Sequence, residues 1–207
     1  KEIASDTIWL SLLTMKTHTY IAALLAVVLI GGAYYISPSE DRAERGGDTS
    51  LASAFERLSS EGNSTCSAVF TDSIMTMPDD GQIQGSCCSL MSFHRYSEQI
   101  EGLKKYKDIP EIPTDPYNVN AGLAKELMGY YDMELTPAEQ EAYDYAMGNS
   151  HEKGPCCCKC WRWYVYGGLA KLLIQKYHFT GEQIVDVWNL SDGCGGDGEH
   201  VSDHHME

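Results

Sequence analysis

Four of the eight cysteines in this sequence fall within five residues, at positions 156–160. In this CCCKC segment Cys156, Cys158 and Cys160 alternate, so an extended backbone would place three thiols on one side. Disulfides alone would favour a wider spacing, because closing a longer loop constrains the unfolded state more and adjacent cysteines pair poorly. Thiolates are preferred ligands of soft ions such as Cu(I) and Zn(II). The segment therefore indicates a metal site.

A fifth cysteine, Cys194, stands among glycines in the stretch Asp192-Gly193-Cys194-Gly195-Gly196. Glycines allow the backbone to approach another group closely. If the last two helices form a hairpin, this stretch returns to the start of the helix that begins near Cys160. We therefore expect a closed four-thiolate site that binds Cu(I), with Zn(II) as the next choice. Its ligands would be Cys156, Cys158, Cys160 and Cys194.

Other cysteines and histidines could serve as accessory ligands or as thiol-exchange partners. The pair Cys87-Cys88 is followed by His94, which resembles a second group of ligands, although the spacing fits no standard zinc pattern. The histidines near the end of the chain could collect a metal ion loosely. The full accessory set is Cys157, Cys87, Cys88, His94, His200, His204 and His205.

Two other functions fit the same cysteines. Because eight is an even number, Cys66, Cys87, Cys88 and Cys194 could form four structural disulfides with the CCCKC segment. Alternatively, positions 157 and 160 form a CxxC pair whose second thiol opens a helix. A helix N-terminus lowers a thiol pKa, which suits a thiol–disulfide oxidoreductase.

The remaining motifs give little support to an enzyme. The sequence contains no P-loop, GxSxG, HExxH or glycine-rich dinucleotide loop. It also lacks a βαβ pattern, which counts against a thioredoxin-type fold. A soft-metal-binding protein for sequestration, delivery or sensing is therefore the preferred hypothesis, and the oxidoreductase and the disulfide-stapled module are its alternatives.

The charge balance of the sequence argues against nucleic acid as a partner. The chain has 207 residues and a formal net charge of −15, from 15 basic and 30 acidic residues. Nucleic-acid binding requires lysine and arginine to displace counterions from phosphates, so we expect no nucleic-acid partner. The expected partners are a metal ion, the membrane through one N-terminal helix, and a protein that the sequence does not identify.

One apolar run, Tyr20 to Ile36, carries no charged residue. It follows Met15 and Lys16, which resemble a start codon and a short basic region, so residues 1–14 are expected to be an upstream extension. We interpret residues 15–36 as a signal-anchor, or else as a cleaved signal peptide. Either one exports the body, which would be single-pass at the cell membrane or secreted. Outside the cytoplasm, cysteines oxidise unless a metal ion holds them.

The rest of the chain is predicted to be mainly α-helical. Residues 37–50 read as a linker, 51–196 as a helical cysteine-rich domain, and 197–207 as an acidic tail with histidines. Residues 59–86 are expected to form an irregular loop, and no alternating pattern predicts a strand. Apolar periodicity and capping residues predict helices over 51–58, 89–106, 118–131, 136–147, 160–177 and 180–190. The helix over 160–177 would have an apolar face, and its Gly167-Gly168 pair indicates either close helix packing or a weak point. That face consists of Trp161, Val165, Leu169, Leu172 and Leu173.

Residues 155–160, Pro-Cys-Cys-Cys-Lys-Cys, resemble the signature of the PCYCGC-motif family of exported bacterial proteins. Cys156, Cys158 and Cys160 match the family cysteines, whereas Cys157 and Lys159 stand where the family has tyrosine and glycine. The resemblance covers about residues 135–196. It implies an extracytoplasmic, metal-associated role. Family members are commonly lipid-anchored, and this sequence lacks the cysteine that such anchoring needs.

Overall fold

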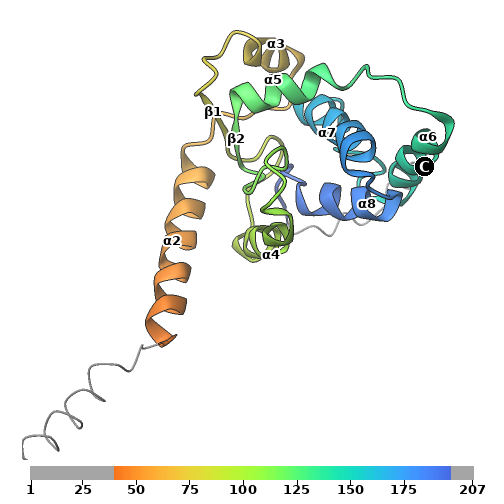
Figure 1. Ribbon diagram of the computed structural model, residues 1–207. Coiled ribbons are helices and arrows are strands. Elements are labelled where there is room, and N and C mark those ends of the chain that lie inside the picture. The colour runs from red at the N-terminus through yellow and green to blue at the C-terminus, as the bar shows by residue number, and fades with distance from the viewer. Residues whose placement is uncertain (1–39, 197–207) are drawn as a thin grey trace, which may run out of the picture. The chain divides into compact units, whose positions relative to one another are not determined.

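The computed structural model describes residues 40–196, and side chains from residue 49 onward. The chain divides into two compact units, residues 1–48 and 49–207, and the account below concerns the second. The described part is mainly helical, as the sequence predicts (Figure 1). Its helices are α2 (Glu40–Ser60), α3 (Ala68–Ile74), α4 (Phe93–Leu103), a 3₁₀ turn (Lys104–Tyr106), α5 (Ala121–Gly129), α6 (Pro137–Asn149), α7 (Trp161–Tyr177) and α8 (Gly181–Leu190).

Helix α7 is the centre of the hydrophobic core. Eleven of its residues are buried, including the whole apolar face predicted from the sequence, and α5, α6 and α8 pack around it (Figure 1). The approach of α5 is the closest. A Cβ atom added to Gly168 would lie 1.9 Å from the carbonyl oxygen of Leu127. The predicted close packing at the Gly167-Gly168 pair is thus confirmed.

Helices α6 and α8 begin where the sequence predicts. Thr136 and Glu139 form a complete capping box at the start of α6, and Thr180 and Gln183 form another at α8. Each box satisfies backbone N–H groups that the first helical turn leaves without partners. Helix α8 is then fixed on α7, because the indole of Trp188 donates a hydrogen bond of 3.0 Å to the Tyr166 carbonyl. The end of α8, from which the Cys194 loop departs, is therefore held close to α7.

Three expectations about local structure are wrong. The predicted loop 59–86 contains α3 and the strand β1 (Gln82–Gln84), and the predicted linker 37–50 is helical from residue 40. The helix expected from residue 118 begins only at residue 121. Before it, β2 (Asn118–Asn120) pairs antiparallel with β1, with Ile83 opposite Val119. Strands of three residues are too short for an alternating pattern to show in the sequence.

The N-terminal segment lies outside the described residues. Within the part that the structure describes, no helix is long and apolar enough to cross a membrane. The expectations for residues 1–14 and 15–36 therefore stay predictions, as does that for the tail at residues 197–207.

The contact between α5 and α7 gives a first prediction. Gly168→Ala should lower the free energy of unfolding by about 3 kcal/mol, because the new methyl group must push two helix backbones apart. Gly148→Ala is the matched control, since a Cβ at Gly148 in α6 meets nothing within 4 Å. The control should be neutral or stabilising by up to ~1 kcal/mol. Chemical denaturation followed by circular dichroism measures both. Equal stability of the two variants would contradict the close α5–α7 contact.

Candidate metal centre

All eight cysteines gather in one connected cluster of thiols. They come from four separate segments of the chain, and the structure joins none of them in a disulfide. Cys66 precedes α3, and Cys87 and Cys88 follow β1. The CCCKC segment precedes α7, and Cys194 follows α8. The cluster is thus built from loops that the helices hold together.

The loop after β1 and the loop after α8 lie side by side. The N–H group of Cys87 donates to the carbonyl of Gly193 at 3.3 Å, and the N–H group of Ser89 donates to that of Cys194 at 2.8 Å. Gly195 has a φ of +87°, and a Cβ there would lie 2.3 Å from the Ser89 carbonyl oxygen. Glycine is therefore required beside Cys194, both for the backbone conformation and for the close approach.

Helix α4 anchors this pair of loops from the other side. The side chain of Arg95 donates a hydrogen bond to the Asn189 carbonyl, and that of Gln99 donates to the Asp192 carbonyl. These carbonyls lie at and beyond the end of α8, where a helix leaves its acceptors without intrahelical partners. Both α4 residues thus fix the chain just before Cys194.

The CCCKC segment is bent, and the bends bring its thiols together. At the end of α6 the Ser150 hydroxyl accepts a hydrogen bond of 2.8 Å from the N–H group of Gly154, which turns the chain toward the cysteines. The N–H group of Cys160 donates to the Cys158 carbonyl at 2.8 Å, and Cys160 is then the N-cap of α7. As a result, Cys156 lies close to both other alternating cysteines.

The inner part of the cluster centres on Cys156. Its sulfur lies 3.3 Å from that of Cys194, 3.7 Å from that of Cys160 and 3.9 Å from that of Cys158. The other three residues of the predicted site are therefore all neighbours of Cys156. The four do not form one closed group, because Cys158 shares its group with Cys66 and Cys88.

The outer part of the cluster contains a cysteine that the sequence analysis did not select. The sulfur of Cys66 lies 2.7 Å from that of Cys158, and Cys88 lies 4.0 Å from Cys158. Cys66 and Cys88 are exposed, whereas Cys158 is half-buried. Cys66 lies 92 residues before Cys158 in a polar stretch. In the sequence, only the even number of cysteines indicated that Cys66 has a partner in the CCCKC segment.

Four groups of three sulfurs could each hold a metal ion, since the three sulfurs of a group lie within 4.8 Å of one another. Both members of the pair Cys87-Cys88 belong to these groups, so they are central to the cluster and not accessory to it. Cys157 also belongs, 3.4 Å from Cys194. Cys157 and Cys160 share none of these groups. The groups are Cys66–Cys88–Cys158, Cys87–Cys88–Cys194, Cys87–Cys156–Cys160 and Cys156–Cys157–Cys194.

A buried cation stands beside the thiols. Arg162 lies in the first turn of α7 and is only 1 % exposed. Its guanidinium is 4.5 Å from the Trp161 ring and donates one hydrogen bond of 3.4 Å to the Gly85 carbonyl. Its Nε and Nη1 atoms have no hydrogen-bond partner, and no ion pair among the described residues includes it.

A positive charge in the first turn of a buried helix is unfavourable, because both desolvation and the helix dipole oppose it. Burial indeed acts to lower the pKa of Arg162. The neighbouring groups, Tyr166, Cys87 and Cys194 first, outweigh it and hold that pKa above its ordinary value. A Cβ at Gly193 would lie 2.1 Å from the guanidinium carbon, so the Cys194 loop closes directly over the charge. Arg162 therefore favours negative charge on the groups around it, the thiols of Cys87 and Cys194 among them.

One thiol of the cluster differs from its neighbours in the direction of its pKa. The pKa of Cys87 lies below its ordinary value because side-chain hydrogen bonds with Cys156, Cys160 and Cys194 favour its ionised form. The positive charge of Arg162 acts in the same direction, whereas burial opposes it. Cys87 is therefore the sulfur of the cluster at which negative charge is most favoured.

The remaining thiols hold their protons more tightly. The pKa of Cys156 is raised, chiefly through its side-chain hydrogen bonds with Cys160 and Cys194. Burial is the first cause of the raised pKa values of Cys88 and Cys158. A soft ion that bound here would replace these protons, as metal ions do at thiolate sites.

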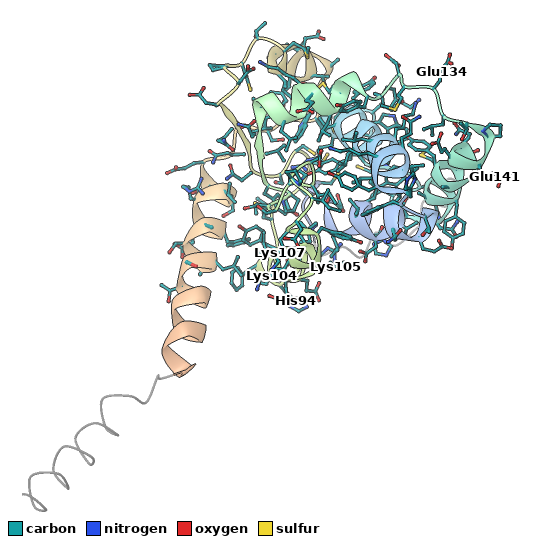
Figure 2. All side chains as sticks on the ribbon, viewed as in Figure 1. His94, Lys104, Lys105, Lys107, Glu134 and Glu141 are labelled. Atoms are coloured by element: carbon teal, nitrogen blue, oxygen red, sulfur yellow. The ribbon has the colours of Figure 1, made fainter. Side chains whose placement is uncertain are left out.

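His94, the one histidine of the predicted accessory set among the described residues, does not take part in the cluster. His94 is 87 % exposed and pairs with Glu98 at 3.2 Å on α4. Figure 2 shows it on the outer side of that helix, pointing away from the body. It belongs to none of the possible metal-binding groups among the described residues. His200, His204 and His205 lie outside the described residues.

Comparison with known proteins adds no further assignment: no protein-family model, curated protein or solved structure matches this chain. The chemistry of the site therefore follows from its own geometry, which offers soft sulfur ligands in groups of three beside a buried cation.

The burial of the thiols predicts two classes of reactivity. In the reduced, metal-free protein, Cys66, Cys88 and Cys157 should react first with iodoacetamide, since they are exposed. Buried thiols must wait for local opening, so they should react slower by a factor on the order of 100. Peptide mapping by mass spectrometry identifies the labelled residues, and a denatured sample gives the unprotected rates. Equal rates for all eight in the folded protein would contradict the buried cluster. The slow thiols are Cys156, Cys160 and Cys194.

Proposed function

We propose that this protein binds a soft metal ion through its cysteine cluster, with Cu(I) as the preferred ion and Zn(II) as the next. The observation that carries the proposal is the convergence of eight unpaired thiols from four segments next to a buried arginine. Structural cysteines need only one partner each, whereas these sulfurs gather in overlapping groups. Soft thiolates select Cu(I), Zn(II) and iron–sulfur clusters over hard cations.

The size of the groups favours Cu(I) over Zn(II). Each possible metal-binding group in the described part of the chain contains three sulfurs. Structural Zn(II) sites almost always have four ligands in a closed tetrahedron. Cu(I) is satisfied by three thiolates, and its single charge is suited to a site that already contains a cation. An iron–sulfur cluster would place its inorganic core between the cysteines, and sulfurs this close leave no room for that core.

The biological setting belongs to the same proposal. The resemblance of residues 155–160 to the PCYCGC motif and the apolar run before residue 37 support an exported protein, anchored or secreted. An oxidising compartment would turn an unprotected cluster into disulfides, and a bound soft ion prevents this. Sequestration, delivery or sensing of the ion requires no catalytic group, so the proposal assigns no catalytic residue.

One observation favours the disulfide-stapled alternative. The sulfurs of Cys66 and Cys158 are only 2.7 Å apart, and both are accessible to an oxidant. A disulfide there would link α3 to the CCCKC segment and remove one group of three sulfurs. This alternative predicts a metal-free protein in which every cysteine is paired.

The direct test is native mass spectrometry of the full chain, purified without oxygen from cells supplied with copper and zinc. Intact mass reports bound metal and lost thiol hydrogens together. We expect stoichiometric Cu(I) with reduced cysteines, and a large loss of metal in Cys156→Ser because that sulfur is central. His94→Ala is the control and should bind as the parent does, since His94 lies outside the cluster. Metal-free protein with four disulfides would overturn the proposal in favour of the staple.

Replacing the buried arginine should affect the stability of the metal-free protein and its affinity for Cu(I) in different ways. Arg162→Met should leave the metal-free protein as stable or raise its unfolding free energy by up to about 2 kcal/mol, because it removes a buried charge whose Nε and Nη1 atoms have no hydrogen-bond partner. The same change should weaken Cu(I) binding at least ~10-fold, about 1.4 kcal/mol, because the thiolates lose their neighbouring cation. Arg57→Met, which removes the same charge from an exposed position on α2, is the matched control. Competition with a chromophoric Cu(I) chelator measures affinity, and an unchanged affinity in Arg162→Met would contradict the charge argument.

A further inference from the structure

The four groups of sulfurs overlap in a regular way. Four cysteines each belong to two groups, and the other four each belong to one. Three of the groups contain at least one unshared sulfur, and the fourth, Cys87–Cys88–Cys194, consists of shared sulfurs only. Its three shared sulfurs connect it to each of the other groups, so the four groups form one continuous network. The shared sulfurs are Cys87, Cys88, Cys156 and Cys194, and the unshared sulfurs are Cys66, Cys157, Cys158 and Cys160.

We propose that the eight thiolates hold a single tetranuclear Cu(I) cluster, with one ion in each group of three sulfurs. This inference rests on the proposed function, and it changes the site from one ion with four ligands to four ions with bridging ligands. Each shared sulfur bridges two ions, and each unshared sulfur binds one.

The number of copper–sulfur bonds that the ions need equals the number that the sulfurs provide. Four ions with three ligands each need twelve copper–sulfur bonds. Four bridging sulfurs provide two bonds each and four terminal sulfurs provide one each, which is also twelve. Four Zn(II) ions in tetrahedra would need sixteen, so every one of the eight sulfurs would have to bridge. The division into shared and unshared sulfurs thus fits three-coordinate Cu(I) and leaves tetrahedral Zn(II) short of ligands.

The charge is also accounted for. Four Cu(I) ions and eight thiolates carry a net charge of −4, and the Arg162 guanidinium reduces it beside the shared sulfurs of Cys87 and Cys194. The remaining negative charge lies near the exposed sulfurs of Cys66, Cys88 and Cys157, where water screens it. Binding replaces thiol protons, which leave to solvent. Copper enters and remains as Cu(I), so no electron is transferred.

The groups differ in burial, and this sets the order of occupancy. Two of the three sulfurs of Cys66–Cys88–Cys158 belong to exposed residues, whereas Cys156 and Cys160 in the innermost group are buried. Ions reach the protein at the outer group and are held most tightly at the innermost one. A chelator should therefore remove the ions in steps, beginning with the outer group.

The first experiment is an anaerobic titration of the reduced full chain with Cu(I) supplied as its acetonitrile complex. Native mass spectrometry counts the bound ions, and X-ray absorption at the copper edge reports the ligands. We expect saturation at four ions per chain, sulfur-only coordination by three ligands, and a short copper–copper vector, which bridging thiolates impose. Saturation at one ion, or four ions without a copper–copper vector, would overturn the cluster.

Two exposed cysteines provide a matched pair of variants. Cys66 is unshared and Cys88 is shared, and both are exposed, so neither substitution disturbs the core. Cys66→Ser should lower the stoichiometry from four ions to three. Cys88→Ser should lower it from four to two, because it removes a ligand from two groups. Cys157→Ser, also exposed and unshared, should match Cys66→Ser.

The outcomes separate this inference from the proposed function. One tightly bound Cu(I) that all three exposed variants retain would overturn the cluster while the soft-metal function stands. No bound Cu(I) in the reduced parent would overturn both. Equal stoichiometries of Cys66→Ser and Cys88→Ser would overturn the bridging role of Cys88, even with several ions bound to the parent.

Discussion

The constraint on which the rest of this structure depends is a permanent positive charge buried at the start of its central helix. Arg162 stacks on Trp161, bonds the Gly85 carbonyl and lies directly under Gly193. It therefore touches α7, the loop after β1 and the loop after α8 at once. Desolvation and the α7 dipole both oppose this charge, so the fold must place negative charge beside it. The thiols of Cys87 and Cys194 and the carboxyl group of Asp115 are among the groups that the fold places there.

The division of labour between helices and loops follows from this requirement. Helices present side chains at fixed spacings of three and four residues, which suits a packed core around α7 but not eight sulfurs in contact. Loops can bring sulfurs together, although they need support for their backbone groups. Glycines at positions 193 and 195 allow the close approach, and Arg95 and Gln99 of α4 fix the chain that leads to it. The helical body is thus the scaffold, and the cluster occupies the place where four loops meet.

The sequence predicts those features that depend on local chemistry. The capping boxes at Thr136 and Thr180, the buried face of α7 and its close-packed glycines are all local patterns, and the structure confirms them. The position of Cys194 beside the CCCKC segment is also predictable, because the last two helices return the chain to the start of α7. The rest depends on contacts across long stretches of chain. Cys66 meets Cys158 over 92 residues, and the β1–β2 pair joins two strands too short to carry a pattern.

Arg162 is a second feature whose role the sequence alone does not reveal. In the sequence it is an ordinary charged residue near the start of a helix, and helical periodicity alone would place it among apolar neighbours without explaining its charge. Its meaning appears only when Cys87 and Cys194 arrive from elsewhere in the chain. Conversely, a cluster of thiols without a buried cation would gain little by becoming ionised in a dry site. The cation and the sulfurs are therefore understood together, and the proposed soft monovalent ion would bind thiolates while adding the least positive charge beside the arginine.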